Sequence, residues 1–90
     1  MKARAHIYVS GRVQGVFYRL TTKNEAEKRN VTGWIRNLSD GRVEAIIEGE
    51  KVSVGSMIDF CWKGSSGTKV DEIELSWEPY IGEYKGFRIV

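Results

Sequence analysis

The segment from Gly11 to Arg19 near the N-terminus contains residue types that suit anion binding. Gly11 and Gly15 permit the backbone angles with which a loop turns several N–H groups toward one point. Arg19 can place two parallel N–H donors on phosphate oxygens, and a helix that follows the loop adds its positive end. On glycine spacing alone, however, a connecting loop with its arginine in a surface ion pair is the favoured interpretation.

A second segment, Gly33 to Gly49, carries an amide side chain that can act on a water molecule. Asn37 both donates and accepts hydrogen bonds, so it can hold a water in a fixed orientation. It also lies just before the turn Ser39-Asp40-Gly41, and asparagine commonly serves only to shape such turns. From the residues alone, that structural role is favoured over catalysis.

Other side chains with chemical potential are few. His6 falls on the polar side of an alternating segment, which predicts a sheet-surface residue rather than a base. Cys61 is the only cysteine, so no internal disulfide is expected, and its place on an apolar helical stripe predicts a core position. No cluster of His, Cys or carboxylate side chains has metal-ligand spacing, so we expect neither a metal nor any other cofactor.

The elements that must position the first segment are a strand before it and a helix after it. Residues 3–9 alternate between apolar and polar side chains, as a half-buried strand does. Residues 21–30 are rich in helix formers. Thr21 or Thr22 is expected to cap the start of this helix, and Asn30 to take the left-handed position at its end.

The rest of the chain predicts a hairpin, a second helix and two more strands. Strands at 34–38 and 43–48 flank the turn and form the hairpin. A strand at 73–77 directs Ile73, Leu75 and Trp77 to one side, and residues 87–90 add a short final strand. The second helix is indicated by one apolar stripe made of Val54, Ile58, Cys61 and Trp62, which continues despite the helix-weakening Gly55.

This order is βαββαβ with a short C-terminal strand. It predicts an α+β, ferredoxin-like sandwich, in which an antiparallel sheet carries two helices on one face. With 90 residues, no repeat and no linker, a single domain spanning 1–90 is expected. The net charge of +2 is too small to imply nucleic-acid binding. We see neither a signal peptide nor a membrane-spanning run, so the expected location is cytoplasmic.

The two segments together resemble the two signatures of the acylphosphatase family. The first signature is an apolar residue followed by G-x-V-Q-G-V-x-(aromatic)-R, which matches Val9 and then Gly11 to Arg19. Two motifs of this length, in order and at the expected separation, are highly specific. Weaker similarity continues through Gly64, Val70, Asp71, Trp77 and Phe87. The second signature, G-W-V-x-N-x-x-x-G-x-V closing on a glycine, is matched by Gly33, Trp34, Asn37, Gly41, Val43 and Gly49.

The resemblance implies a hydrolase that splits small acyl phosphates into a carboxylate and inorganic phosphate, without a metal or a covalent nucleophile. Arg19 matches the arginine that binds the substrate phosphate, and Asn37 matches the asparagine that positions the attacking water. The backbone cradle around the phosphate matches Gln14, Gly15, Val16, Phe17 and Tyr18.

Four departures from the family pattern lie away from these positions. Ile35 replaces the usual valine, which is a conservative exchange. Arg29 stands where an apolar residue is usual and Asn30 where glycine is usual, so both bear on helix packing and capping. Ser65-Ser66 stands where two prolines are common, which predicts a looser loop.

Two other function classes compete with hydrolysis. RNA-recognition modules share the βαββαβ order, and Lys85-Gly86-Phe87 echoes the start of one of their motifs. That fragment is C-terminal, however, and not on the third strand. The outward positions of the third strand are Glu44, Ile46 and Glu48, and two carboxylates without an aromatic would repel a nucleic-acid backbone. A non-catalytic anion-binding domain has little need of Asn37 beside Arg19. We therefore expect a small-molecule substrate and neither a nucleic-acid nor a membrane partner.

Overall fold

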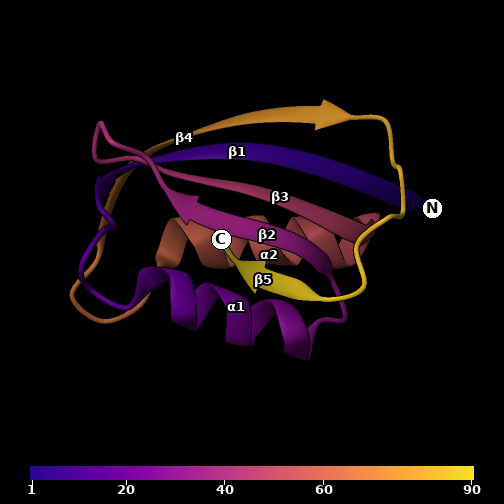
Figure 1. Ribbon diagram of the computed structural model, residues 1–90, viewed down its shortest axis with the longest axis horizontal. Coiled ribbons are helices and arrows are strands. Elements are labelled where there is room, and N and C mark those ends of the chain that lie inside the picture. Colours follow the sequence, from indigo (N-terminus) through magenta and orange to yellow (C-terminus); the bar gives the residue numbers. More distant parts are fainter.

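The computed structural model describes residues 1–90, which form a five-stranded sheet with two helices on one of its faces (Figure 1). The predicted βαββαβ order with a short final strand is confirmed. The elements are β1 (Lys2–Arg12), α1 (Tyr18–Lys28), β2 (Thr32–Asn37), β3 (Val43–Glu50), α2 (Lys51–Lys63), β4 (Lys69–Glu78) and β5 (Phe87–Ile89).

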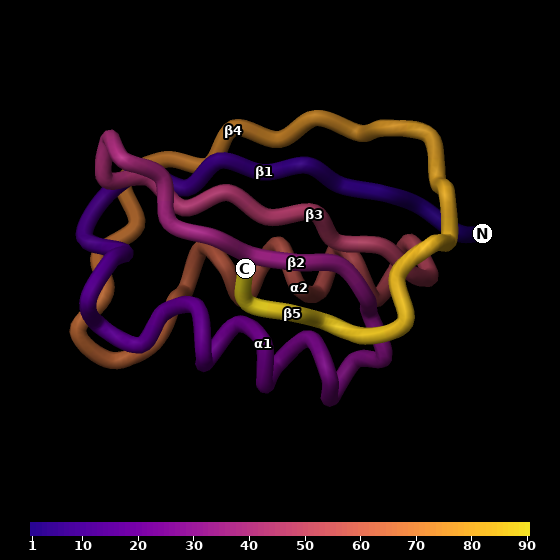
Figure 2. The backbone as a smooth tube through the Cα atoms, viewed as in Figure 1, coloured from indigo at the N-terminus to yellow at the C-terminus, as the bar shows by residue number.

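The strands lie in the order β4-β1-β3-β2-β5. The four long strands pair antiparallel, as a ferredoxin-like sheet requires. The short strand β5 departs from the fully antiparallel prediction because it pairs parallel to β2. After β4 the chain crosses to the opposite edge of the sheet, past the ends of β1 and β3, and then runs alongside β2 (Figure 2).

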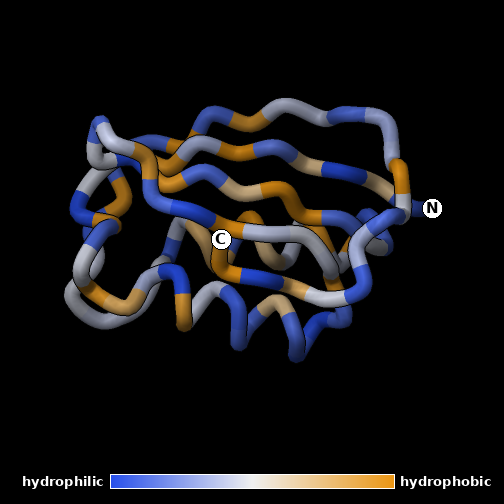
Figure 3. The backbone as a smooth tube through the Cα atoms, viewed as in Figure 1, coloured by the Kyte–Doolittle hydropathy of each residue, from blue (hydrophilic) through white to orange (hydrophobic).

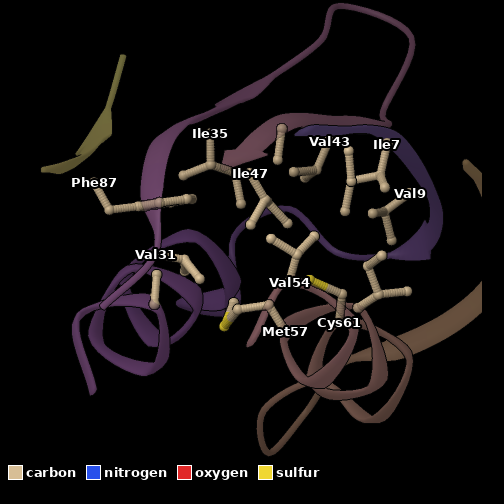
Figure 4. Packing of buried hydrophobic residues seen from close by; sticks show 14 of the residues in the cluster. Ile7, Val9, Val31, Ile35, Val43, Ile47, Val54, Met57, Cys61 and Phe87 are labelled. Atoms are coloured by element: carbon tan, nitrogen blue, oxygen red, sulfur yellow. The ribbon is translucent and has the colours of Figure 1, made fainter. Parts of the chain in front are cut away.

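The hydrophobic core lies between the sheet and the two helices. Apolar and polar residues alternate along β1 (Figure 3), and its apolar set includes the fully buried Ile7 and Val9. From α2, Val54 and Cys61 point toward the sheet (Figure 4), and both are fully buried. The predicted core position of Cys61 is therefore confirmed.

Three residues that the sequence places on the apolar side of a helix or strand, Trp62, Leu75 and Trp77, are about half exposed. Trp62 is 48% exposed because a residue eight positions after Val54 lies roughly 80° around the helix from it. Met57 is buried on the stripe instead. Leu75 and Trp77 pair in register with β1 residues, but β4 is an edge strand and the helices leave it partly uncovered.

Helix α1 begins at Tyr18, three residues before the predicted start. Thr21 and Thr22 do not cap it, so that prediction is wrong. Their hydroxyls donate to carbonyl oxygens four residues earlier inside the helix, at 3.0 and 2.7 Å. The N-cap is Phe17, which has a left-handed backbone and makes no capping hydrogen bond with its side chain. The first N–H groups of the helix consequently have no hydrogen-bond acceptor within the chain.

The end of α1 follows the prediction. Asn30 has a φ of 56°, the left-handed conformation that asparagine tolerates better than most residues. Its N–H donates to the carbonyl of Glu27 at 3.2 Å, and the N–H of Val31 donates to the carbonyl of Ala26 at 3.1 Å. This pair of bonds closes the helix in a Schellman motif.

The face of the sheet without helices, which we call the open face, is lined with paired charges. The outward carboxylates of β3 point there as expected, but they are buried rather than free: Glu44 is 5% exposed and Glu48 is fully buried. Glu48 accepts hydrogen bonds from the N–H groups of Ile81 and Gly82, at 3.0 and 3.2 Å, and lies 3.4 Å from Arg4. Segment 79–86 is thereby fastened over one end of this face.

Candidate active site

The loop between β1 and α1, residues 13–17, has a backbone that alternates in handedness, and we call it the glycine loop. Gly15 has a φ of 75° and Phe17 a φ of 60°, whereas Val16 between them is not left-handed. Alternation of this kind turns successive N–H groups to one side and makes a concave anion site, or nest. The N–H groups from Gly15 to Leu20 donate no hydrogen bond within the chain, and α1 begins behind them.

Phe17 is the conformational outlier of this loop. A bulky residue in the left-handed region is uncommon and costs on the order of 1–3 kcal/mol. Its ring is 78% exposed, so burial of the ring does not offset the strain. The strained position is the N-cap, directly before the first N–H groups of α1. No sequence pattern signals this conformation, since glycine would be the expected residue.

Tyr18 fixes the glycine loop to helix α2. The residue is 1% exposed, and its hydroxyl donates to the carbonyl oxygen of Cys61 at 2.8 Å. Burial raises the pKa of Tyr18 far above its ordinary value, and burial raises the pKa of the Cys61 thiol to about 12. Both side chains are therefore protonated at neutral pH, and neither is available as a base or thiolate nucleophile.

A second support comes from the loop at 64–68. The Ser65 hydroxyl donates to the carbonyl oxygen of Val16 at 3.5 Å, and the Thr68 N–H donates back to the carbonyl of Ser65 at 3.1 Å. Gly64 has a φ of 70°, and a Cβ there would lie 2.2 Å from the Thr68 hydroxyl oxygen. Ser65 thus contacts the glycine loop directly. The predicted loosening by Ser65-Ser66 stays a prediction.

Gln14 joins the glycine loop to the β2–β3 hairpin. Its side-chain amide donates to the carbonyl oxygens of Leu38 and Arg42, at 2.8 and 2.9 Å. The two carbonyls stand on opposite sides of the hairpin, because the Leu38 N–H donates to Arg42 across it. The sequence motif assigns a role to the backbone of Gln14. The hydrogen bonds between its side chain and the hairpin are seen only in the structure.

Asn37 is the last residue of β2. It lies two residues after the buried Ile35 on the same face of the strand, so its side chain is on the helix-covered side of the sheet. Its Oδ1 atom is buried and has no hydrogen-bond partner in the chain. An unpaired buried acceptor costs about 1–3 kcal/mol, so a donor such as a water molecule is expected there.

Arg19 lies in the first turn of α1 and takes part in no ion pair or side-chain hydrogen bond within the chain. Its side chain helps to line a pocket of about 240 Å³ at the start of the helix. The pocket brings together four of the predicted site positions, whereas Gln14, Val16 and Asn37 lie outside its lining. The lining residues are Val13, Gly15, Phe17, Tyr18, Arg19, Leu20 and Ile89.

His6 lies on the open face, which is the opposite side of the sheet from α1. Its ring nitrogens contact carboxylates of Glu44 and Glu78 at 2.6 and 2.8 Å. The predicted sheet-surface position is thus confirmed. No local pattern indicates the two carboxylate partners, because they come from β3 and β4. His6 is remote from the pocket and plays no part in it.

Comparison with known proteins agrees with this geometry. The family model described as "Acylphosphatase" matches residues 5–89. The chain belongs to the acylphosphatase family. The curated acylphosphatase of Roseiflexus sp. (strain RS-1) is 48% identical over 88 residues, covering 98% of this chain and 95% of that protein. The acylphosphatase of Haloarcula marismortui is 52% identical over 86 residues, covering 96% and 93%.

Comparison with solved structures also identifies an acylphosphatase fold. The crystal structure of acylphosphatase from Bacillus subtilis superposes with a TM-score of 0.94 at 37% identity, and covers 100% of this chain and 99% of that one. A domain of full-length HypF superposes with a TM-score of 0.85 at 29% identity, but the match is only 12% of that longer chain.

Proposed function

We propose that the chain hydrolyses acyl phosphates, as the acylphosphatases it resembles do (EC 3.6.1.7). In this proposal Arg19 and the backbone N–H groups of Gln14 to Tyr18 hold the phosphoryl group, and Asn37 orients the attacking water. The observation that carries it is the run of unpaired N–H groups at the start of α1, beside an arginine without a carboxylate partner.

The charge requirements of the reaction match these groups. Phosphoryl transfer depends mainly on positioning and on stabilising charge at the three equatorial oxygens. N–H dipoles, the positive end of α1 and the Arg19 guanidinium all supply positive potential at one place. Because Phe17 and Gly15 hold the N–H groups in place before substrate arrives, little reorganisation is needed at the moment of reaction.

Asn37 is suited to orienting the nucleophilic water. A water that donates one proton to the unpaired Oδ1 keeps a lone pair free to attack phosphorus. The new bond forms between the water oxygen and phosphorus while the bond from phosphorus to the acyl oxygen breaks. The carboxylate leaves with the electron pair, and the second water proton passes to a phosphate oxygen.

This route needs no general acid or base from the protein. The leaving carboxylate has a pKa near 4 and is a good leaving group without protonation. The side chains of Tyr18, directly after the glycine loop, and of Cys61, whose carbonyl oxygen accepts the Tyr18 hydrogen bond, are protonated and buried in the core. Proton transfer to the substrate's own phosphate oxygen is therefore the step that fits these residues.

The remaining expectations from the sequence are part of the same proposal. Residues 1–90 are taken to act as one domain, without a cofactor, on a small molecule in the cytoplasm and without a nucleic-acid partner. No group of three His, Cys, Asp or Glu side chains has an arrangement that could hold a metal ion. Neither α1 nor α2 has the length and apolar character needed to cross a bilayer.

Benzoyl phosphate and phenyl phosphate form a matched pair of test substrates. Both carry one ring and one phosphoryl group, but the second must expel a phenolate whose pKa is near 10. We expect steady turnover of benzoyl phosphate and negligible turnover of phenyl phosphate. Binding of phosphate without turnover of either compound would instead support a non-catalytic anion-binding domain.

The matched control for the site is Arg88→Ala against Arg19→Ala. Arg88 is exposed on β5, next to Trp34 of β2, and therefore faces the open side of the sheet. Both variants lose one positive charge, but only the loss of Arg19 is expected to lower turnover strongly. Equal loss in the two variants would attribute the effect to net charge and overturn the proposed site.

A further inference from the structure

The pocket beside Arg19 has an apolar wall that phosphate binding does not require. Leu20 in the first turn of α1 is 48% exposed, and Ile89 of β5 is 38% exposed. Phe17, the last residue of the glycine loop and the N-cap of α1, lines the same pocket. Single exposed apolar residues are common on protein surfaces. Here, however, residues from the glycine loop, α1 and β5 converge on one concavity that also contains a guanidinium.

A ligand that matches this concavity has an anionic end and an apolar body. We infer that Leu20 and Ile89, with Phe17, form an acyl subsite that selects acyl phosphates with an aromatic or bulky apolar acyl group. The inference rests on the proposed function, because it assigns the phosphoryl end of the substrate to the N–H groups and Arg19. The acyl carbon is one oxygen away from phosphorus, so the acyl group must lie at the rim of the same pocket.

The size of the pocket agrees with such a ligand. An apolar cavity of about 150 Å³ holds a benzene ring. A pocket of about 240 Å³ therefore has room for a ring together with part of the phosphoryl group. An acetyl group would leave the side chains of Leu20 and Ile89 in contact with water.

The position of Asn37 agrees as well. In-line displacement places the attacking water and the leaving group on opposite sides of phosphorus. Asn37 does not line the pocket, whereas Leu20 and Ile89 do. Water held by Asn37 and an acyl group held by the apolar wall therefore do not compete for the same space.

The test compares substrates and variants together, so that differences in intrinsic reactivity cancel. The ratio of kcat/KM for benzoyl phosphate over acetyl phosphate is measured in wild type, Leu20→Ala and Ile89→Ala. A hydrophobic contact of one or a few methylene groups discriminates by roughly 10- to 200-fold. We expect the ratio to fall by about tenfold in each variant, because turnover of benzoyl phosphate falls more than turnover of acetyl phosphate.

Two comparisons sharpen the test. Ile81→Ala removes an isoleucine of segment 79–86 that is more exposed than Ile89, at 59% against 38%, and lies away from the pocket, so it should leave the ratio unchanged. Butyryl phosphate and succinyl phosphate have acyl chains of equal length, but the second ends in a carboxylate. We expect butyryl phosphate to be preferred, and the preference to shrink in Leu20→Ala and Ile89→Ala.

Binding of phosphonates separates this inference from the proposed reaction. Benzylphosphonate and methylphosphonate cannot be hydrolysed, so calorimetry reports affinity alone. Tighter binding of benzylphosphonate that depends on Leu20 and Ile89 supports the subsite even if no acyl phosphate is turned over, an outcome that would refute only the hydrolysis. Turnover with a benzoyl preference that survives in both alanine variants would overturn the subsite and leave the proposed function standing.

Discussion

The side-chain amide of Gln14 lies 2.8 Å from the carbonyl oxygen of Leu38, the residue that directly follows Asn37. This contact links two parts of the site that are far apart in the sequence. The N–H groups after Gln14 are those assigned to the anion in the proposed function, and Asn37 ends the strand on the other side of the contact. The distance between the phosphoryl group and the water in the proposed reaction is therefore set partly by Gln14.

Replacing Gln14 with leucine should impair both stability and alignment. Leucine is similar in size but donates no hydrogen bond, so the two bonds to the hairpin are lost at a cost of about 1–3 kcal/mol in the free energy of unfolding. We expect kcat to fall more than the affinity for inorganic phosphate, since the N–H groups remain. Urea unfolding and phosphate inhibition on the same variant measure the two effects. A kcat equal to that of wild type would show that the contact only stabilises the fold.

Arg19→Ala should lower kcat/KM by roughly 10³-fold, the smaller end of the range for an arginine that stabilises a transferring phosphoryl group. Inhibition by inorganic phosphate should weaken in parallel, because the same guanidinium binds the product. Arg19→Lys should recover little, since an ammonium cannot reproduce the planar pair of donors. If phosphate inhibits Arg19→Ala as well as wild type, Arg19 does not bind the anion.

Asn37→Ala should separate catalysis from binding and from stability. Loss of one oriented donor or acceptor at a transition state lowers kcat by roughly 10²–10³-fold. Phosphate inhibition should change little. Because Oδ1 is buried without a partner, its removal should not lower the melting temperature. The competing structural role for Asn37 predicts the reverse, namely a lower melting temperature and a normal kcat in the folded fraction.

Chelation should leave the activity intact. In the proposed site, Arg19 and the N–H groups provide the positive potential that a metal supplies in other phosphoryl-transfer enzymes. The measurement is turnover of benzoyl phosphate before and after excess EDTA. Activity that disappears with EDTA and returns with a divalent ion would contradict the mechanism.

The stability of the fold should depend on pH through His6. Burial disfavours the charged ring, but hydrogen bonds to Glu44 and Glu78 outweigh it and hold the pKa of His6 above its ordinary 6.5. The charged His6 ring therefore stabilises the folded state. This stabilisation is complete below about pH 6.5 and is lost as pH rises through the raised pKa of His6. The pKa of Glu44 is lowered from 4.5, since its hydrogen bonds to His6 and Arg36 outweigh burial. The pKa of Glu78 is lowered as well, chiefly by its hydrogen bond to His6, so the carboxylate contribution is lost as pH falls below about 4.5.

The melting temperature of wild type should therefore be highest between about pH 4.5 and 6.5 and fall on the alkaline side. His6→Gln should flatten the alkaline decline, because glutamine does not titrate. Turnover at a fixed pH should be unaffected, since His6 faces the open side of the sheet. If the melting temperatures of wild type and His6→Gln fall in parallel above pH 6.5, the titration of His6 does not cause the alkaline decline.

The sequence predicts the elements well where the signal is local. Alternation along β1 and the turn before β3 are short-range patterns, and both elements form as expected. The left-handed Asn30 likewise follows from the residue's own preference. The start of α1 cannot be predicted from local preference in this way. The left-handed backbone of Phe17 accompanies a long-range hydrogen bond between Tyr18 and Cys61.

The site is predicted by residue identity but not by arrangement. The motifs identify Arg19 and Asn37 as candidates, yet they give no sign that Gln14 would bind the hairpin through its side chain. They also say nothing of Ile89 in the pocket, because β5 reaches it only after crossing the sheet. Such features depend on pairing between strands that no local pattern encodes.

The place of β1 between β3 and β4 has a consequence for synthesis of the protein. Arg4 bonds to Glu78, 74 residues later in the chain. At a ribosomal rate of roughly 5–20 residues per second, β1 therefore waits about 4–15 seconds for its second neighbour. Contacts of such long sequence separation also slow folding, because a long loop must close before they form. The strand that leads into the glycine loop is thus made first and completed late, and in the nascent chain the edge of β1 that pairs with β4 has no partner in the meantime.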